Sequence, residues 1–512
     1  MTHTHSGCCG CHGLEMGRRS FLAAASGTTL GMTASAVAAP RGRGTKHERV
    51  QPVIKKQELV VQPVLLHQQF VRREATSWRP WGGLQNAGGV AREGARIESE
   101  LKQLRSVAEF PLRVLPLRGV TSKAEAESVR ATPADVNLIY AASGDGGVLE
   151  ALLAPERHNM VFVRHESGPV YLWYEIIHPR MLRKTVDEYG EPGLTNDDIV
   201  VDDTDDLLWR LRGLYALKNS VGSRIVAIGG ASGWGHGGRN APQLARDKWK
   251  LDIVDVSYDD LAKRITAMRG DSANVDRYRS EAADYLRLPK TKLETKMDFV
   301  SGAFLLRDVF ERVMAEADAA AITVNECMST IMPMACTTAC LTLTLINDAG
   351  MLAFCESDFV VIPSGILLHH VASTPVFLQD PTYPHHGVIT LAHCTAPRKM
   401  DGKRLEPARI MTHFESDYGA APKVEMKVGQ VVTVIDPDFA EARWLGFRGY
   451  VQDNPFMDIC RSQVDVEIDG DCRELAQEMR GFHWMLAYGD HLKEAGYALG
   501  KLGIGWRNLS VA

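Results

Sequence analysis

The stretch that decides the fold runs from Met351 to Thr395 and reads MLAFCESDFVVIPSGILLHHVASTPVFLQDPTYPHHGVITLAHCT. Two of its short apolar runs are followed by a carboxylate, Glu356 and Asp380, and a third run begins just after His386. A strand that is fixed by packing places the side chains at its tip reproducibly. The pattern therefore predicts that these three groups meet in a cleft.

The residue types point to a metal site. Two carboxylates and one imidazole suit Mn²⁺ or another divalent ion, and they leave coordination positions open for a substrate. Carboxylates beside a metal also suit proton transfer between adjacent carbon atoms. The alternative interpretation of the same residues is a set of polar loop ends in an ordinary α/β core.

Three segments of the chain resemble a known family. ASTPVFLQDPTY (372–383) and HHGVITLAHCT (385–395) resemble the metal-site segments of the L-fucose isomerase family. LTLTLINDAGMLAFCESD (341–358) resembles the segment that carries the family's first acidic ligand. The resemblance covers residues 319–398 best, is looser in the rest of the C-terminal part and is faint before Arg224.

The resemblance implies a role for each residue of the site. It implies that Glu356 ligates Mn²⁺ and acts as a proton-transfer base, that Asp380 is its partner, and that His386 is the histidine ligand. One spacing departs from the family, because a long segment separates the aspartate from the histidine there and only five residues do so here. His385 and His393 are therefore alternative histidine ligands.

Four further residues are candidates for contacting the substrate: Glu326, His393, His413 and His483. Glu326 follows a predicted strand, and a helix cap or a solvated loop is the alternative. His483 lies in a GFH stretch that resembles a GxH stretch of the related arabinose isomerases, whose histidine reaches the metal. For His413 and His483, a hydrogen-bonded position in the core is the alternative.

The rest of the chain predicts three domains. Its 512 residues are 45% hydrophobic, which is enough for about two to four domains. Alternating strand-like and helical runs predict two Rossmann-like α/β domains, at 45–222 and at 223–370, and the second carries Glu356. Short alternating strands with Gly and Pro turns predict a C-terminal β-barrel domain at 371–512. The predicted fold class is α/β, and the resemblance implies the same three-part layout.

Residues 1–38 are interpreted as a twin-arginine signal peptide. Arg18 and Arg19 precede a mildly apolar run, and Ala36-Val37-Ala38 offers a small-residue cleavage site. The prediction is export to the periplasm or beyond, with no membrane anchor, because no unbroken apolar stretch of about 18 residues follows. A net charge of −5 without a basic stripe argues against nucleic acid as a partner.

The cysteines do not predict a disulfide framework. Three of the ten lie in the leader, and the seven that remain are an odd number at irregular spacing. Cys336 and Cys340 are four residues apart in a helical pattern, which fits packing on one helix face better than metal ligation.

These observations lead to a functional prediction. The ligand set predicts a metal-dependent aldose–ketose isomerase that acts on a deoxy- or pentose-type sugar through a cis-enediol, with Mn²⁺ or another divalent metal. The resemblance implies a homo-oligomer, a trimer or a hexamer, because a neighbouring subunit completes the site in that family.

Two alternatives remain open. The first is an exported NAD(P)-dependent oxidoreductase that uses the loop Gly229–Gly238, in which Gly233, Gly235 and Gly238 match GxGxxG. Four residues stand between the preceding strand and the first matching glycine, which favours instead a flexible loop over the substrate cleft. The second alternative is a non-catalytic, sugar-binding relative of the isomerases.

Overall fold

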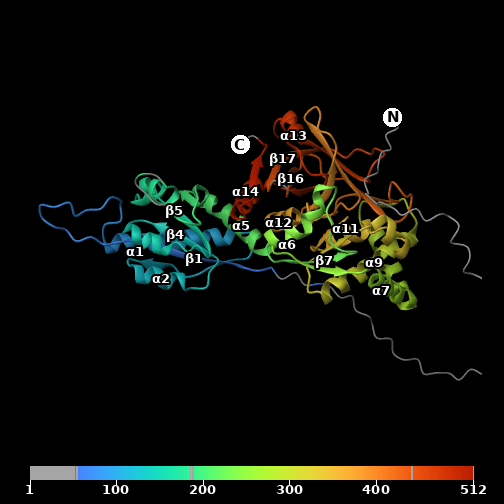
Figure 1. Ribbon diagram of the computed structural model, residues 1–512, viewed down its shortest axis with the longest axis horizontal. Coiled ribbons are helices and arrows are strands. Elements are labelled where there is room, and N and C mark those ends of the chain that lie inside the picture. The colour runs from blue at the N-terminus through green and yellow to red at the C-terminus, as the bar shows by residue number, and fades with distance from the viewer. Residues whose placement is uncertain (1–51, 53–55, 185, 187–189, 440–441, 511–512) are drawn as a thin grey trace, which may run out of the picture.

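The computed structural model describes residues 52, 56–184, 186, 190–439 and 442–510. The predicted signal peptide at 1–38 lies outside these residues. Two parallel sheets with their helices are followed in the chain by a closed β-barrel. In Figure 1 the first sheet forms the left end of the molecule, and the second sheet and the barrel lie together on the right. The predicted mixed α/β architecture with a C-terminal barrel is confirmed at this level.

The first sheet is parallel and has the strand order β2-β1-β4-β5-β6, with β3 also paired to β1. Its central strands, β1 (Leu59–Leu66), β4 (Val136–Ala141) and β5 (His158–Val163), are apolar and almost entirely buried, as is typical of a parallel sheet covered on both faces. The other elements are β2 (Leu112–Val114), β3 (Arg118–Val120), β6 (Ile199–Val201), α1 (Ala87–Val107), α2 (Lys123–Arg130), α3 (Gly146–Leu152), α4 (Trp173–Ile177) and α5 (Thr204–Ser220).

The second sheet is also parallel and has the order β11-β10-β7-β8. The strands are β7 (Arg224–Ile228), β8 (Asp252–Val256), β10 (Ala321–Val324) and β11 (Leu352–Phe354). The longest helix beside it, α9 (Met297–Glu316), buries its apolar side against the sheet. The remaining helices of this part are α6 (Ala241–Lys248), α7 (Tyr258–Gly270), α8 (Ser272–Leu286), α10 (Met332–Ala335), α11 (Cys340–Asp348) and α12 (Ile362–Ala372).

The charged segment 286–296 contributes a strand to a sheet. It forms the short strand β9 (Thr291–Leu293), which pairs in parallel with β14 (Ala408–Met411) of the C-terminal part. β14 also pairs with β15 (Ala421–Val424), so β9 joins a small three-stranded sheet. Local composition favoured a helix, but pairing with a strand that is distant in the chain supplies the hydrogen bonds of the backbone.

Six antiparallel strands close the barrel in the order β16-β19-β12-β13-β18-β17, with β17 paired back to β16. They are β12 (Phe377–Pro381), β13 (Val388–His393), β16 (Val431–Asp436), β17 (Arg443–Asp453), β18 (Ser462–Ile468) and β19 (Trp484–Tyr488). The strand β20 (Gly505–Asn508) adds to β17, and two helices, α13 (Cys472–Glu478) and α14 (Leu492–Lys501), complete this part. Closure leaves no free edge in the ring itself.

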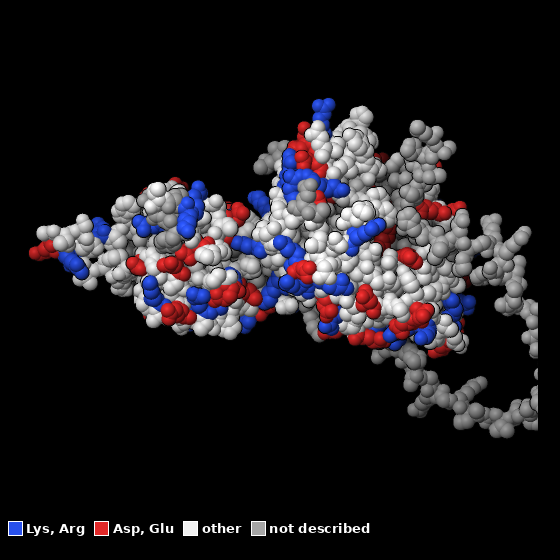
Figure 2. All heavy atoms as spheres, in the orientation of Figure 1, with Lys and Arg blue, Asp and Glu red and all other residues white. Residues whose placement is uncertain are grey.

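Helix α5 connects the three parts, because it packs against both α12 and α14. On the face shown in Figure 2, Lys and Arg side chains are interspersed with Asp and Glu. Among the described residues, no single helix meets the length and apolarity needed to cross a membrane, although the segments Cys327–Ala335 and Cys340–Asp348, bent by 88°, meet them as a pair.

Candidate metal centre

The candidate site lies where the carboxyl edge of the second sheet meets the barrel. Glu356 comes two residues after β11, whereas Asp380 lies on β12, His393 ends β13 and His483 directly precedes β19. One ligand atom each of Glu356, His393 and His483 lies within 4.8 Å of the others. Residues that are far apart in the chain therefore meet at one point.

Glu356 sits on a sharply turned backbone. It and Ser357 have φ angles of 65° and 49°, in the left-handed region that non-glycine residues rarely adopt. The loop is held in place because Ser357 N–H donates to Thr323 and Ser232 N–H donates to the Ser357 carbonyl. Such a strained conformation persists only where its surroundings fix it, and it is typical of functional sites.

His483 is the centre of the polar contacts. Its Nε2 atom lies 3.3 Å from a carboxylate oxygen of Glu356 and 3.3 Å from Oδ1 of Asp380. Its Nδ1 atom lies 2.7 Å from Oδ2 of Asp358. Although burial opposes the charged form, the hydrogen bonds to Asp358 and Glu356 raise the pKa of His483 well above its usual value. A carboxylate behind the far nitrogen of a histidine is the arrangement that orients metal-ligating imidazoles.

His393 reaches the same carboxylate from the other side. Its Nε2 atom lies 3.8 Å from Oε1 of Glu356, and its Nδ1 atom lies 3.2 Å from the hydroxyl of Thr395. Burial works against a charged ring, but the hydrogen bond to Glu356 outweighs it and raises the pKa of His393 to about 9. Both imidazoles thus direct Nε2 at Glu356, whose own pKa they lower although its burial works the other way.

Asp380 is a buried carboxylate that receives no hydrogen bond from the described part of the chain. Only 7% of the residue is exposed, and neither of its side-chain oxygens accepts a hydrogen bond from a described residue. Burial raises the pKa of Asp380 to about 7. A buried carboxylate is costly unless it is paired or coordinates a metal, so this side chain fits a fourth position around an ion.

The donor set fits a divalent metal. Ligand atoms that lie about 2.0–2.2 Å from one ion are about 3–4 Å from each other, which is the spacing of the Glu356, His393 and His483 atoms. Two imidazoles with carboxylates suit Mn²⁺, Fe²⁺ or Zn²⁺. The residues present therefore fit a divalent ion without selecting one.

The structure does not bring His386 to this site. His386 and Gly387 are the two central residues of a hairpin turn in which His385 and Val388 exchange backbone hydrogen bonds of 2.9 Å. Both central residues have positive φ, 52° and 79°, as a type I′ turn requires. His385 and His386 are exposed and contact each other at 3.1 Å. The prediction of His386 as the histidine ligand is corrected to His393 and His483.

The pairing of β12 with β13 and β19 explains why His393 and His483, and not His386, lie beside Asp380. Asp380 pairs with Ala392 across the hairpin, so the end of β13 lies beside it. The turn is at the opposite end of the strand, about 20 Å away by the rise of a strand. On the other side of β12, Gln379 pairs with Trp484, which places His483 next to Asp380.

The second-tier residues divide into two groups. His393 and His483 reach the site. His413 is fully buried nearby, and its burial lowers its pKa, which His393 lowers further and Glu356 raises. Glu326 is exposed and accepts a hydrogen bond of 2.9 Å from Thr330 in the turn that follows it. Its position is the solvated loop that was the alternative. Asp358 had no predicted role, although the Glu-Ser-Asp sequence already placed a second carboxylate beside Glu356.

The glycine-rich loop packs against the metal centre. Trp234 N–H donates to Asp358 at 3.0 Å, and the Trp234 ring stacks on Phe482 with centroids 4.6 Å apart. A cavity of about 570 Å³ beside this loop is lined by Trp234, Asp358 and Phe482 together with Asp438 and Arg480. The loop therefore borders both the cavity and the carboxylate that holds His483.

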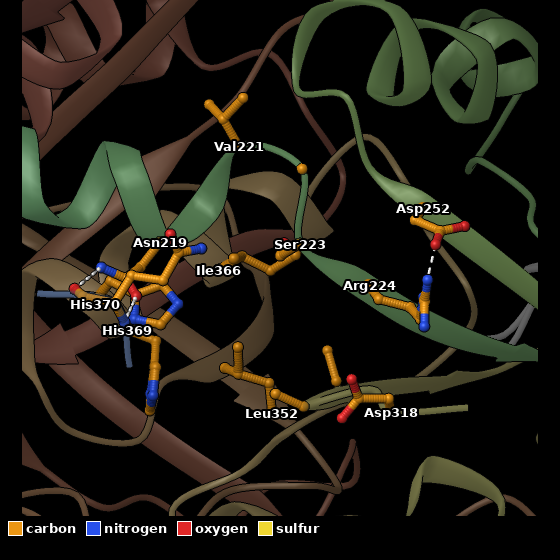
Figure 3. A pocket seen from close by; sticks show the side chains of 14 residues that line it. Asn219, Val221, Ser223, Arg224, Asp252, Asp318, Leu352, Ile366, His369 and His370 are labelled. Atoms are coloured by element: carbon orange, nitrogen blue, oxygen red, sulfur yellow. Dashed lines mark hydrogen bonds and ion pairs between the residues drawn. The ribbon is translucent and has the colours of Figure 1, made fainter. Parts of the chain in front are cut away.

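A second cavity, of about 300 Å³, lies at the other edge of the second sheet. Its lining includes Arg224 and Asp252, which form an ion pair where β7 and β8 begin (Figure 3). His369 and His370 of α12 reach it from the other side. Because parallel strands begin at this edge and end at the other, this cavity is separate from the candidate metal centre.

A search of protein-family models and of curated proteins found no match to this chain.

Proposed function

We propose that this protein is a metal-dependent aldose–ketose isomerase that acts on a deoxy- or pentose-type sugar through a cis-enediol. The observation that carries the proposal is the meeting of Glu356, Asp380 and two imidazoles around a point where a buried carboxylate lacks a hydrogen bond. The resemblance to the L-fucose isomerase family supports it. With His483 as a histidine ligand, a long segment that includes most of the barrel separates the aspartate from the histidine. The spacing then agrees with that of the family, whereas the short spacing between Asp380 and His386 does not.

The chemistry divides between the two carboxylates. A bound divalent ion would supply Lewis-acid polarisation of two adjacent oxygens of the open-chain sugar. Glu356 takes the proton from C2, and the electron pair of that C–H bond becomes the double bond between C1 and C2 while O1 gains a proton. The proton is then returned to C1, and the hydroxyl at C2 loses its own proton as the ketone forms. Asp380 exchanges the hydroxyl protons.

Further parts of the proposal follow from the resemblance and from the leader. The two parallel sheets correspond to two Rossmann-like domains, the metal is Mn²⁺, and the assembly is a homo-oligomer. The twin-arginine sequence directs the folded protein to the periplasm. Size-exclusion chromatography with light scattering and fractionation of the producing cell test the last two points.

The central experiment compares two glutamates at neighbouring strand tips. The mature chain is loaded with Mn²⁺ and assayed for ketose formation from L-fucose, L-arabinose and related sugars. Glu356→Gln is expected to lower the rate by at least about 100-fold, because it removes the proton acceptor. Glu326→Gln is the matched control and is expected to keep the rate, because Glu326 is exposed and bonded to Thr330.

The outcomes separate the candidate functions. An active Glu356→Gln enzyme would contradict the assigned base. Thermal stabilisation by sugar and Mn²⁺ without product from any sugar would instead identify a non-catalytic sugar-binding relative. Metal analysis of the purified protein distinguishes Mn²⁺ from Fe²⁺ and Zn²⁺, which the same donors accept.

A further inference from the structure

A second group of metal-binding side chains lies inside the molecule. One ligand atom each of Cys340, Cys394 and His413 lies within 4.8 Å of the others, and all three residues are buried. Cys340 begins α11, Cys394 follows β13 and His413 follows β14. Neither cysteine forms a disulfide with another described residue. Packing on a helix face was the prediction for Cys340, because it lies four residues after Cys336 in a helical pattern. That spacing gave no sign of Cys394 and His413, which lie far along the chain.

The His413 imidazole points to a ligand. The residue is 0% exposed, and neither ring nitrogen has a hydrogen-bond partner among the described residues. Leaving a buried polar group without a partner costs about 1–3 kcal/mol. A bound cation would satisfy one nitrogen directly, and it would do so at the point where the two thiols approach the ring.

A third thiol adjoins the cluster. Cys460 is buried, and its side chain is hydrogen-bonded to that of Cys394, as is the side chain of Cys340. Three thiols and one imidazole make the Cys₃His set of closed, four-coordinate structural zinc sites. Cys340 belongs to the second α/β part and the other three to the C-terminal part, so an ion here would connect the two.

We propose that Cys340, Cys394 and His413, with Cys460 as the fourth donor, bind a Zn²⁺-class ion that fastens α11 to the barrel. This site is chemically distinct from the proposed isomerase centre. Thiolate and imidazole donors select zinc-class ions, whereas carboxylate-rich sites suit Mn²⁺. Binding releases the thiol protons to solvent, so three thiolates and one neutral imidazole hold the ion and the loaded site carries one net negative charge.

The two sites meet at the end of β13. His393 directs Nε2 at Glu356, while the next residue, Cys394, belongs to the thiol cluster. The Cys394 sulfur lies 3.9 Å from Nδ1 of His393. Metal in the thiol site therefore holds the end of β13 in position behind the isomerase centre.

Cobalt titration of the metal-free, reduced chain tests the proposal. Wild-type protein is expected to show thiolate-to-cobalt charge-transfer absorption in the near ultraviolet that saturates at about one thiolate-bound Co²⁺ per chain, because cobalt adopts the tetrahedral zinc geometry. Cys340→Ser and His413→Gln are expected to lose or strongly reduce this absorption. Cys472→Ser, a partly exposed cysteine on α13, is the matched control and should keep it.

The site is tested independently of the isomerase. Glu356→Gln should retain the thiolate absorption, since it alters only the other centre, so loss of activity there leaves this proposal intact. Wild-type protein that shows no thiolate absorption on cobalt addition would overturn the proposal without any variant. Unchanged absorption in folded Cys340→Ser, checked by circular dichroism, would overturn it as well.

Discussion

At the scale of single residues, Asp358 decides which nitrogen of His483 is available to a metal. Its Oδ1 atom accepts the backbone N–H groups of Trp234 and Val360, each at 3.0 Å. Its Oδ2 atom is therefore left to accept the proton on Nδ1 of His483. Once an ion displaces the proton on Nε2, the lone pair of that nitrogen faces Glu356 and Asp380.

Asp358→Asn is expected to weaken metal binding by about 10–100-fold. The asparagine oxygen must take the place of Oδ1, so its NH₂ group donates to Nδ1 of His483 and moves the ring proton to Nε2. Metal affinity measured by calorimetry checks this result. Asp252→Asn changes an exposed carboxylate at the opposite sheet edge and should leave the affinity unchanged. Equal affinities in the two variants would contradict the role of Asp358.

Metal affinity is also expected to rise with pH. His393, with a pKa of about 9, and Asp380, with a pKa of about 7, hold protons that an ion must displace. Each displaced proton contributes a factor of about ten per pH unit, so the dependence is steepest below pH 7 and continues to pH 9. Titrations in buffers of different ionisation enthalpy measure the protons released. A pH-independent affinity between pH 6 and 9 would exclude this competition.

The free energy of unfolding of the metal-free protein should instead fall as the pH rises. The pKa of His393 is higher in the folded protein than the unfolded value of about 6.5. The contribution of protonated His393 to the free energy of unfolding is therefore fully present below pH 6.5 and is lost as the pH rises through 9. Urea unfolding across that range, with and without Mn²⁺, reports the two opposite trends.

At the scale of elements, the β12–β13 hairpin separates His386, the predicted histidine ligand, from His393, its alternative. His393→Ala is expected to lower metal affinity by at least about 10-fold because it removes a ligand of the ion. His386→Asn is the matched change and should keep the affinity, since asparagine suits a turn residue with positive φ. Stability of His386→Asn should be equal to that of the wild type or higher by about 1 kcal/mol or less. Loss of metal in His386→Asn would reverse the assignment.

The same hairpin shows which parts of the site the sequence can predict and why the other parts cannot be predicted from it. The apolar runs at 224–228 and 321–324 and the amphipathic run at 298–317 have clear limits in the sequence, and they coincide within one residue with β7, β10 and α9. Glu356 and Asp380 were found because each follows such a run. His386 was expected to be the ligand because the resemblance implies it, but pairing between strands decides the contact and composition does not encode it. Counting outward from the His386–Gly387 turn would have placed Asp380 beside residues 391–393.

At the scale of the whole molecule, the candidate metal centre joins two bodies of structure. Glu356 comes from the second α/β part, while Asp380, His393 and His483 come from the barrel. A ligand that binds only the folded state stabilises it by about 2.7 kcal/mol at a concentration of 100 Kd. A metal here therefore couples the folding of the two parts.

Removal of metal is accordingly expected to lower the melting temperature of the wild-type protein, and excess Mn²⁺ should restore it. Glu356→Gln should show a much smaller response to Mn²⁺, because one ligand of the junction is lost. Differential scanning calorimetry measures both. If neither chelator nor Mn²⁺ changed the melting temperature of the wild-type protein, the metal would not couple the folding of the two parts.

The order of donors along β13 has one more consequence. Consecutive residues of extended backbone point to opposite sides, and the imidazole of His393 at the end of β13 is followed directly by the thiol of Cys394. A slip of the strand by one position would exchange them, offering sulfur to the hard-ion centre and nitrogen to the soft one. Insertions or deletions between Val388 and Cys394 should therefore reduce metal binding far more than substitutions that keep the strand register. A shift by one residue would place the wrong donor in both centres at once.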